Sequence, residues 1–270
     1  MRPLVMGILN VAPDSFAESS ARRDRAATID AALRMEADGA DLIDIGGEST
    51  RPGAQPILVS EECDRILPVL EGLRQRLAVP VSVDTYKADV ARAAIAAGAS
   101  IINDISGLQF DPSLAGVAVE SGAPIILMHT RGRPGTMNDE AVYGDVVADV
   151  IRELRGRLAA ATAAGVPLDR IIVDPGIGFA KRPPHSYGLL ARLPELSAAL
   201  DRPMLVGPSR KSFMREALGG RPAPDRDWGT AAAVTTAVWN GAHIVRVHAV
   251  REMVQVARVA EEIRRHGCDG

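Results

Sequence analysis

The sequence predicts a (β/α)8 barrel that forms a single domain over residues 1–270. Three observations indicate this fold. Short apolar, β-branched runs alternate with longer amphipathic stretches rich in Ala, Leu and Arg, and eight such pairs fill the chain. The short runs are apolar almost without interruption, which is typical of parallel strands that helices cover from outside. Gly or Pro marks most of the places where a helical stretch gives way to the next run.

The predicted elements follow one another in strand–helix order. We expect strands at residues 4–9, 42–45, 79–83, 100–102, 124–128, 170–173, 203–206 and 243–247. Helices are expected near residues 24–38, 60–77, 87–97, 112–121, 145–164, 186–199, 227–240 and 250–265. The sequence contains no repeat longer than one strand–helix unit and no linker between domains.

A doubly wound sheet with a dinucleotide site is the competing α/β fold. It usually carries a glycine-rich fingerprint directly after its first strand. Here that turn reads Asn10-Val11-Ala12-Pro13-Asp14-Ser15-Phe16, without a glycine. Gly176-Ile177-Gly178 fails as well, because Lys181 stands where the third glycine would be. The barrel is therefore the better prediction.

Composition excludes several classes of protein. A net charge of −3 and a pI near 6.0 argue against a general nucleic-acid or membrane-surface binder. No apolar run approaches the roughly 18–20 residues of a membrane-spanning helix. The first residues become polar too soon for us to expect a signal peptide in them. Cys63 and Cys268 make no disulfide framework, and Cys63 lies on a helical stripe with Ile66 that predicts an ordinary core position. We expect a cytoplasmic protein.

Polar residues stand at or just beyond the end of every predicted strand, where barrel enzymes have their active sites. They are Asn10 and Asp14; Asp44 and Glu48 to Arg51; Asp84; Asn103 and Asp104; His129; Asp174 and Lys181; Ser209 to Lys211; and Arg246 and His248. Single members, such as Asp44 or Asp104, can equally be structural. The complete ring is harder to explain by helix capping or solvation alone.

The ring divides into two chemical groups. Arg246 and His248 lie two residues apart and could hold an anion. The second group consists of Asp84, Asn103, Asp174 and Lys211. These side chains could accept hydrogen bonds from ring N–H groups and donate one to a carbonyl, which suits a flat heterocycle such as a pterin or guanine. Asn10 and Asp14 offer oxygen ligands to a hard cation such as Mg2+.

Eight motifs at these strand ends resemble, in the same order, those of bacterial dihydropteroate synthases. They are residues 10–16; Asp44-Ile45-Gly46-Gly47-Glu48-Ser49-Thr50-Arg51-Pro52-Gly53; Ser82-Val83-Asp84-Thr85; Ile102-Asn103-Asp104-Ile105; Leu127-Met128-His129; Asp174-Pro175-Gly176-Ile177-Gly178-Phe179; Gly207-Pro208-Ser209-Arg210-Lys211-Ser212; and Arg246-Val247-His248. Together they cover essentially the whole chain.

This resemblance implies an enzyme of folate biosynthesis. The family joins 7,8-dihydropterin-6-ylmethyl diphosphate to 4-aminobenzoate and releases pyrophosphate by dissociative C–O cleavage with Mg2+ as cofactor, and it is the target of sulfonamides. The resemblance implies small-molecule substrates, no nucleic-acid or membrane partner, and a homodimer, for which a surface near Trp239 and Met253 is a candidate.

The family's functional residues carry over motif by motif. The resemblance assigns catalysis to Asp84, Asp174, Lys211, Arg246 and His248, and metal binding to Asn10. It assigns the pterin to Asp84, Asn103, Asp174 and Lys211, and the anion to Thr50, Arg51, Arg246 and His248. It assigns the aminobenzoate pocket to Phe16, Pro52, Phe179 and Ser209, and adds Met128 and Val247 as substrate-binding residues.

The chain also departs from the family pattern. Ala12 replaces a usual Thr, Glu18-Ser19-Ser20 replaces Asp-Gly-Gly, Ala249 stands where Asp is usual, and Ile177 replaces a common Phe. None of these positions belongs to the predicted pterin group. Two alternatives therefore stay open: a non-catalytic pterin-binding relative, which the altered first loop motivates, and a methyltetrahydrofolate–corrinoid methyltransferase built on the same pterin pocket.

Overall fold

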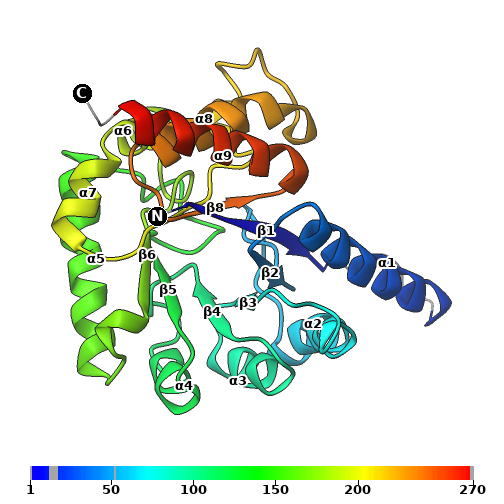
Figure 1. Ribbon diagram of the computed structural model, residues 1–270. Helices are drawn as coiled ribbons and strands as arrows, with labels where there is room; N and C mark the ends of the chain where they lie inside the picture. The colour runs from blue at the N-terminus through cyan, green and yellow to red at the C-terminus, as the bar shows by residue number, and fades with distance from the viewer. Residues whose placement is uncertain (1, 12–17, 52, 268–270) are drawn as a thin grey trace.

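The chain folds into a parallel barrel with helices outside it (Figure 1). The structure is a computed structural model that describes residues 2–11, 18–51 and 53–267, and of residues 18–24 the backbone alone. Strands β1 to β8 span Leu4–Asn10, Leu42–Gly46, Val81–Asp84, Ile101–Asp104, Ile125–Met128, Ile171–Asp174, Leu205–Val206 and Ile244–Val247. The predicted fold class is confirmed, and each strand lies within two residues of its predicted bounds.

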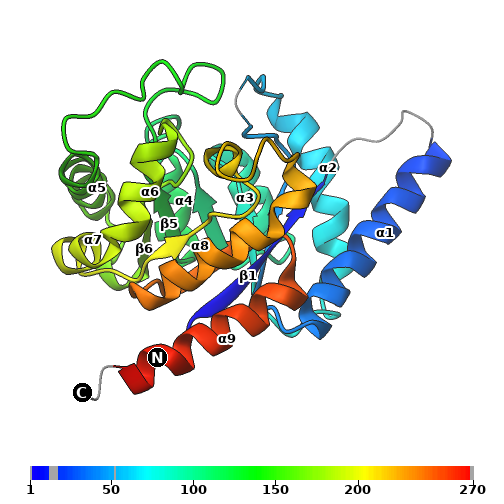
Figure 2. The same ribbon diagram turned by 90° about the horizontal axis from the view of Figure 1, so that it is seen from above.

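The helices cover the outside of the strands. Helices α1 to α9 span Glu18–Ala37, Val59–Leu73, Ala88–Ala96, Leu114–Ser121, Val146–Ala163, Pro183–Ala191, Leu193–Leu200, Asp227–Trp239 and Val250–Gly267. Short 3-10 turns occur at Leu168–Arg170, Ser212–Met214 and Ala223–Arg226. The long connection from β5 to α5, residues 129–145, has neither helix nor strand and rises as the green loop above the strand ends (Figure 2).

The sheet runs in the order β6-β5-β4-β3-β2-β1-β8-β7, and every pairing is parallel. A single bridge between Val173 and Met204 joins the two ends of this order. Pairing between β6 and β7 is short because β7 has only two residues. Pro203 lies in the predicted strand 203–206 but has no N–H to donate, so regular pairing starts after it.

Alternation along the strands decides which side chains enter the barrel. One buried cluster fills the bottom of the barrel and consists of Met6, Leu42, Ile126, Leu205 and Ile244. Their neighbours in sequence, such as Ile43 and Val245, pack instead into the larger cluster under the helices. Because side chains alternate with a period of two, the positions two residues beyond the barrel floor also face inward. Among them are the charged residues Asp44 and Arg246 and the apolar residue Met128.

The predicted single helix over residues 186–199 is wrong. The structure ends α6 at Ala191 and begins α7 at Leu193, with Arg192 between them at φ −108° and ψ 23°. Pro194 explains the break, because it has no N–H to donate to the Leu190 carbonyl and its ring would clash with that carbonyl in a continuous helix. The Arg192 side chain spans the joint and pairs with Asp145 and Glu195.

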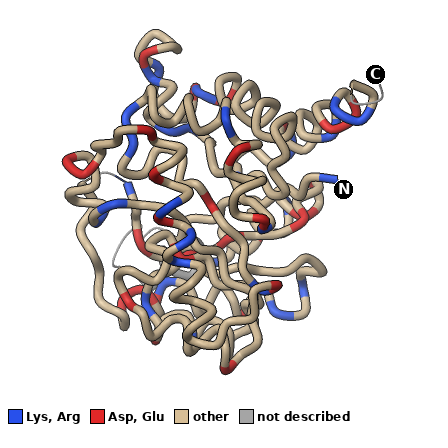
Figure 3. The backbone as a smooth tube through the Cα atoms, turned by 90° about the vertical axis from the view of Figure 1, so that its left-hand side faces the viewer, with Lys and Arg blue, Asp and Glu red and all other residues tan. Residues whose placement is uncertain are grey.

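Charges of both signs are interspersed along the chain on the side that Figure 3 shows. Among the described helices, none has the length and apolar character that crossing a membrane requires. Cys63 is a free, partly buried thiol that packs against the main core cluster, as its helical stripe predicts.

Candidate active site at the barrel mouth

The barrel mouth, formed by the carboxyl ends of the strands, is built around one arginine. The Nε atom of Arg246 donates to Oδ2 of Asp44 at 2.6 Å, and its Nη2 atom donates to Oδ2 of Asp84 at 2.6 Å. Asp44 is completely buried and also accepts from Asn103 Nδ2 at 3.0 Å and from the Ser82 hydroxyl. Four strands, β2, β3, β4 and β8, thus meet in one hydrogen-bonded cluster.

Asp84 keeps one oxygen available. Within the described residues, its Oδ1 atom is buried and accepts no hydrogen bond. Burial raises the pKa of Asp84 to about 7; the charge of Arg246 opposes this rise, and the Asp44 carboxylate adds to it. A buried acceptor without a donor costs free energy, on the order of 1–3 kcal/mol. A ligand N–H group at this position would remove that cost.

Asp174 and Lys211 form the opposite side of the same site. Asp174 is 4% exposed, and its Oδ1 atom accepts from the backbone N–H of Gly176 at 2.7 Å. Burial raises the pKa of Asp174, and the nearby ammonium of Lys211 opposes the rise. Burial also lowers the pKa of Lys211 to about 8, an effect that Asp174 opposes. Lys211 donates to the carbonyl of Ile177 and lies 4.5 Å from the ring centroid of Phe179.

Apolar side chains form a wall beside these charges. Tyr86, Ile105 and Met128 are buried together, and Phe110 and Phe179 pack against them. The rings of Tyr86 and Phe110 meet edge to face, with centroids 5.2 Å apart. Polar atoms at the edge and an apolar wall are the surroundings that a flat, polar heterocycle requires.

The structure brings the predicted pterin group together. Asp84 pairs in register with Asn103, and Arg246 bonds to Asp84. Asp174 and Asp84 both lie close enough for their charges to act on Lys211. Asp44, which the sequence left open as a structural residue, proves to be the carboxylate that links Arg246 to Asn103. Its place two residues beyond the inward-facing Leu42 is the signal that could have found it.

His248 lies apart from the Arg246 cluster. Its Nδ1 atom is 2.9 Å from the Ser209 hydroxyl, which also accepts from the His248 backbone N–H at 3.2 Å. Burial and the charges of Arg210 and Arg246 lower the pKa of His248 to about 4, so the ring is neutral at pH 7. Arg246 thus faces two carboxylates, and His248 offers a neutral ring.

Val247 is a correction to the predicted substrate-binding residues. Its side chain is 0% exposed and packs in the core cluster under the helices. The reason is the alternation of β8, which sends Arg246 to the inside of the barrel and its neighbour to the outside. Thr50 is partly buried and Arg51 is exposed in the connection after β2. Phe16, Pro52 and Asp14 lie outside the described residues.

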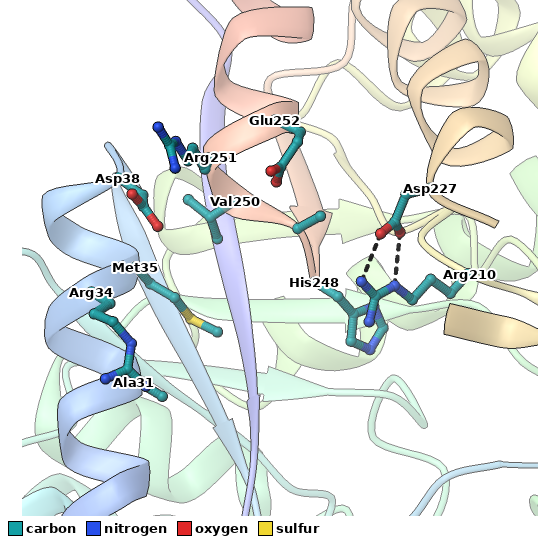
Figure 4. A pocket seen from close by; sticks show the side chains of 11 residues that line it. Ala31, Arg34, Met35, Asp38, Arg210, Asp227, His248, Val250, Arg251 and Glu252 are labelled. Atoms are coloured by element: carbon teal, nitrogen blue, oxygen red, sulfur yellow. Dashed lines mark hydrogen bonds and ion pairs between the residues drawn. The ribbon is translucent and has the colours of Figure 1, made fainter. Parts of the chain in front are cut away.

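A hollow of about 430 Å³ lies on the outer side of His248, between α1 and the start of α9 (Figure 4). Met35 and Val250 line it, together with Arg210 and Asp227. Arg210 makes two hydrogen bonds of 2.7 Å to the Asp227 carboxylate, drawn as dashed lines in Figure 4. Arg210 is thus turned away from the pterin group, and its role is to hold the loop after β7 against α8.

The connection after β2 is fixed by Lys87. Its ammonium donates to Glu48 at 2.6 Å, to Glu62 at 2.7 Å and to the carbonyl of Ile57 at 2.7 Å. Glu48 also accepts from the Tyr86 hydroxyl at 2.7 Å. Lys87 therefore serves the loop that carries Thr50 and Arg51, and it does not belong to the pterin group.

Comparison with known proteins decides the family. Residues 6–248 match the family described as pterin binding enzyme. The chain belongs to the pterin-binding enzyme family. A pterin-binding relative from Synechocystis, named dihydropteroate synthase, is 46% identical over 264 residues, which cover 98% of this chain and 91% of the relative.

Solved structures of pterin-binding enzymes have the same fold. A Yersinia pestis dihydropteroate synthase in complex with a sulfonamide drug superposes with a TM-score of 0.91 at 43% identity and covers 97% of this chain and 94% of its own. The Xanthomonas albilineans dihydropteroate synthase in complex with 7,8-dihydropteroate has a TM-score of 0.86 at 40% identity, with 97% and 94% of the two chains covered.

Asn10 is suited to a cation that a substrate brings with it. It is the exposed last residue of β1, opposite Gly46 at the barrel mouth. Over the described ranges, no group of three His, Cys, Asp or Glu side chains could hold a metal ion. Mg2+ usually keeps several waters and binds through few protein oxygens together with substrate phosphates. One carboxamide oxygen at the mouth fits such an ion.

Proposed function

We propose that this protein acts as a dihydropteroate synthase, a transferase of folate biosynthesis. It joins 7,8-dihydropterin-6-ylmethyl diphosphate to 4-aminobenzoate and releases pyrophosphate. The observation that carries the proposal is the cluster of Asp84, Arg246 and Asn103 facing Asp174 and Lys211, in a chain of the pterin-binding family. This cluster supplies hydrogen-bond acceptors for the amino and ring N–H groups of a pterin and an ammonium for its carbonyl.

The pterin would lie against the apolar wall with its polar edge toward the carboxylates. The unpartnered Asp84 Oδ1 atom would accept a hydrogen bond from one N–H group of the pterin. Asp174 would accept a hydrogen bond from the edge of the pterin that carries the 2-amino group. Lys211 would donate to the carbonyl oxygen. Arg246 remains paired with Asp44 and Asp84, and its planar guanidinium forms a flat cationic surface beside the bound ring.

The diphosphate would extend toward the ends of β1 and β8. Asn10 would hold Mg2+ there, and this ion, when bound, would neutralise charge on the leaving group. Neutral His248 would donate a hydrogen bond to a phosphate oxygen from its Nε2 atom, because Nδ1 faces Ser209. Thr50 and Arg51 would approach from the loop that Lys87 fixes.

The reaction would break the methylene C–O bond first, and the bonding electrons would leave with the diphosphate. Asp84 and Asp174 would provide negative charge near the cationic methylene group. The neutral aniline nitrogen of 4-aminobenzoate would then attack, and its extra proton would pass to water. Phe179 and Ser209 remain our proposal for the aminobenzoate pocket, with Phe16 and Pro52.

We also propose a homodimer in the cytoplasm. Trp228 and Trp239 are 89% and 47% exposed. They are eleven positions apart, which is about three helical turns, so they lie on the same face of α8. Met253 does not belong to this face, because it is 2% exposed in the core. Light scattering should give the mass of a dimer, and Trp228→Glu should shift it to a monomer. A monomeric wild-type protein would contradict the proposal.

Pyrophosphate release tests the function. Purified protein should release pyrophosphate when it receives Mg2+ and both substrates. Steady turnover should depend on 4-aminobenzoate, which captures the cationic methylene group. Tight pterin binding without release would favour the non-catalytic relative, a reading that Ala12, Glu18 and Ala249 motivate. Binding of a corrinoid protein instead of the diphosphate would favour the methyltransferase.

A further inference from the structure

Lys181 is a buried lysine that the proposed reaction does not use. It is 6% exposed and lies near the end of the loop that joins β6 to α6. Its Nζ atom is 2.9 Å from Nδ1 of His129 and 2.9 Å from the carbonyl oxygen of Phe179, and it also donates to the His129 carbonyl at 3.4 Å. Lys181 thus has hydrogen-bond partners on three sides.

His129 connects Lys181 to a carboxylate on α5. The imidazole is completely buried, and its Nε2 atom is 2.9 Å from Oε2 of Glu153. Burial and the charge of Lys181 lower the pKa of His129 to about 3, against the hydrogen bond with Glu153. Burial opposes ionisation of Glu153, but the hydrogen bonds from His129 and Arg131 outweigh it and leave its pKa well below the ordinary value.

The protons in this chain therefore have fixed places. An ionised Glu153 accepts, so the neutral imidazole carries its proton on Nε2 and donates it to Glu153. The Nδ1 atom is then a bare acceptor, which receives a hydrogen bond from Lys181. Burial lowers the pKa of Lys181 well below its ordinary value, against the charge of Asp174; Arg157 and Lys211 lower it further, and Glu153 raises it.

Residues 175–180 of the same loop adjoin Asp174 and Lys211 of the pterin group. The backbone N–H of His129 donates to the Asp174 carbonyl at 2.8 Å. A Cβ atom at Gly176 would lie 1.9 Å from the His129 carbonyl oxygen, so the loop is pressed against the end of β5. On its other side, the loop offers the Ile177 carbonyl to Lys211, whose Cδ would lie 2.9 Å from a Cβ at Gly178. The loop is thus held between two lysines.

We propose that Lys181, oriented by Glu153 through His129, is a positioning residue for the pterin and aminobenzoate sites. It fixes the loop of residues 175–180 so that Asp174, Lys211 and Phe179 keep the geometry that both substrates need. Lys181 itself is directed at the loop backbone and at His129, so it acts through these groups and not on the reacting atoms. This inference rests on the proposed function.

Lys181→Met tests the role, because methionine keeps the apolar stem and removes every donor. We expect the dissociation constant for bare pterin and the KM for 4-aminobenzoate each to rise about tenfold or more, as for a site displaced by a fraction of an ångström. Lys87→Met is the matched control, since Lys87 also satisfies three acceptors but in the loop after β2. The control should keep the affinity for bare pterin within about twofold.

A double-variant cycle distinguishes positioning from mere stability. If Lys181 acts through Lys211, Lys181→Met should reduce the affinity for bare pterin much less in a Lys211→Met background than in the wild-type background. Glu153→Gln offers a milder second variant should Lys181→Met fail to fold. It keeps an acceptor for His129 and removes the charge, and a rise of about threefold in the pterin dissociation constant is expected.

Hydrogen exchange separates this inference from the proposed function. Lys181→Met should speed amide exchange in residues 176–180 and leave the loop of residues 47–58 unchanged, whether or not the wild-type protein forms dihydropteroate. The inference is overturned if folded Lys181→Met keeps wild-type exchange in residues 176–180. The inference is also overturned if Lys181→Met keeps the wild-type dissociation constant for pterin and the wild-type KM for 4-aminobenzoate.

Discussion

Arg246→Met should destabilise the protein in a pH-dependent way. The substitution leaves Asp44, which is completely buried, and Asp84, whose side chain is 10% exposed, without their cationic partner. Removing one member of a buried ion pair typically costs about 3–5 kcal/mol, because the remaining charge is desolvated and uncompensated. We expect a loss of this size in the free energy of unfolding at pH values above neutrality.

The sign of the pH dependence follows from Asp84. Its pKa in the folded protein, about 7, lies above the ordinary value of 3.8, so the folded state binds a proton more tightly than the unfolded state. Stability therefore falls as the pH rises from about 4 to about 7. Without Arg246 the pKa of Asp84 rises further and the fall extends to higher pH. The difference between variant and wild type should consequently be small at acidic pH and grow through neutrality.

Urea unfolding of both proteins, at about pH 5.5 and about pH 8.5, measures this difference. Adding Asp44→Asn to Arg246→Met removes one of the two unpaired charges and keeps acceptors for Ser82 and Asn103, so it should restore part of the loss. A loss below about 1 kcal/mol at both pH values would refute the argument, because it would make the cluster no stronger than a surface ion pair. A loss of equal size at both pH values would refute the role of Asp84.

Three further predictions concern the opposite side of the site. Asp174→Asn should reduce the affinity for bare pterin and for pterin diphosphate by the same factor, about tenfold, in calorimetric titrations; a loss of affinity confined to the diphosphate would place Asp174 on the anion side. Pterin affinity should decline above about pH 8, as Lys211, whose pKa is lowered to about 8, loses its proton; a Lys211→Met variant that keeps this decline would exclude Lys211 as its cause. Gly176→Ala should cost about 3 kcal/mol or more in thermal unfolding, because its Cβ would meet the His129 carbonyl at 1.9 Å. Gly122→Ala is its control, with the same φ of 68° but no atom within 4 Å, and an equal cost for both would show that φ alone is responsible.

The sequence was sufficient for the fold because its signals are local and repeated. Apolar runs, helical stretches and the residues that end them each depend on a few neighbouring positions, and eight repetitions reinforce one another. The prediction failed where a single residue outweighed the pattern. Pro194 divides the helix expected over residues 186–199 although the apolar periodicity continues through it.

The site was only partly predictable from the sequence. Strand ends indicate which residues reach the mouth, and Asp84, Asn103 and Asp174 do so. The hydrogen-bond partners of these residues depend on closure of the barrel. Arg246 bonds to carboxylates that lie 162 and 202 residues away in the sequence, and no short-range pattern encodes these contacts. Val247 was misplaced because a matching motif does not distinguish the inward from the outward side of a strand. Glu153 was not predicted because it lies on helix α5, and only residues at strand ends were considered as candidates.

The thin joint between β6 and β7 has a functional consequence. Asp174 ends one wall of this joint, and Lys211 follows the other, so the two chemically opposed groups stand on either side of the weakest-paired place in the barrel. A ligand that contacts both Asp174 and Lys211 would therefore connect the two strands that share the fewest paired residues.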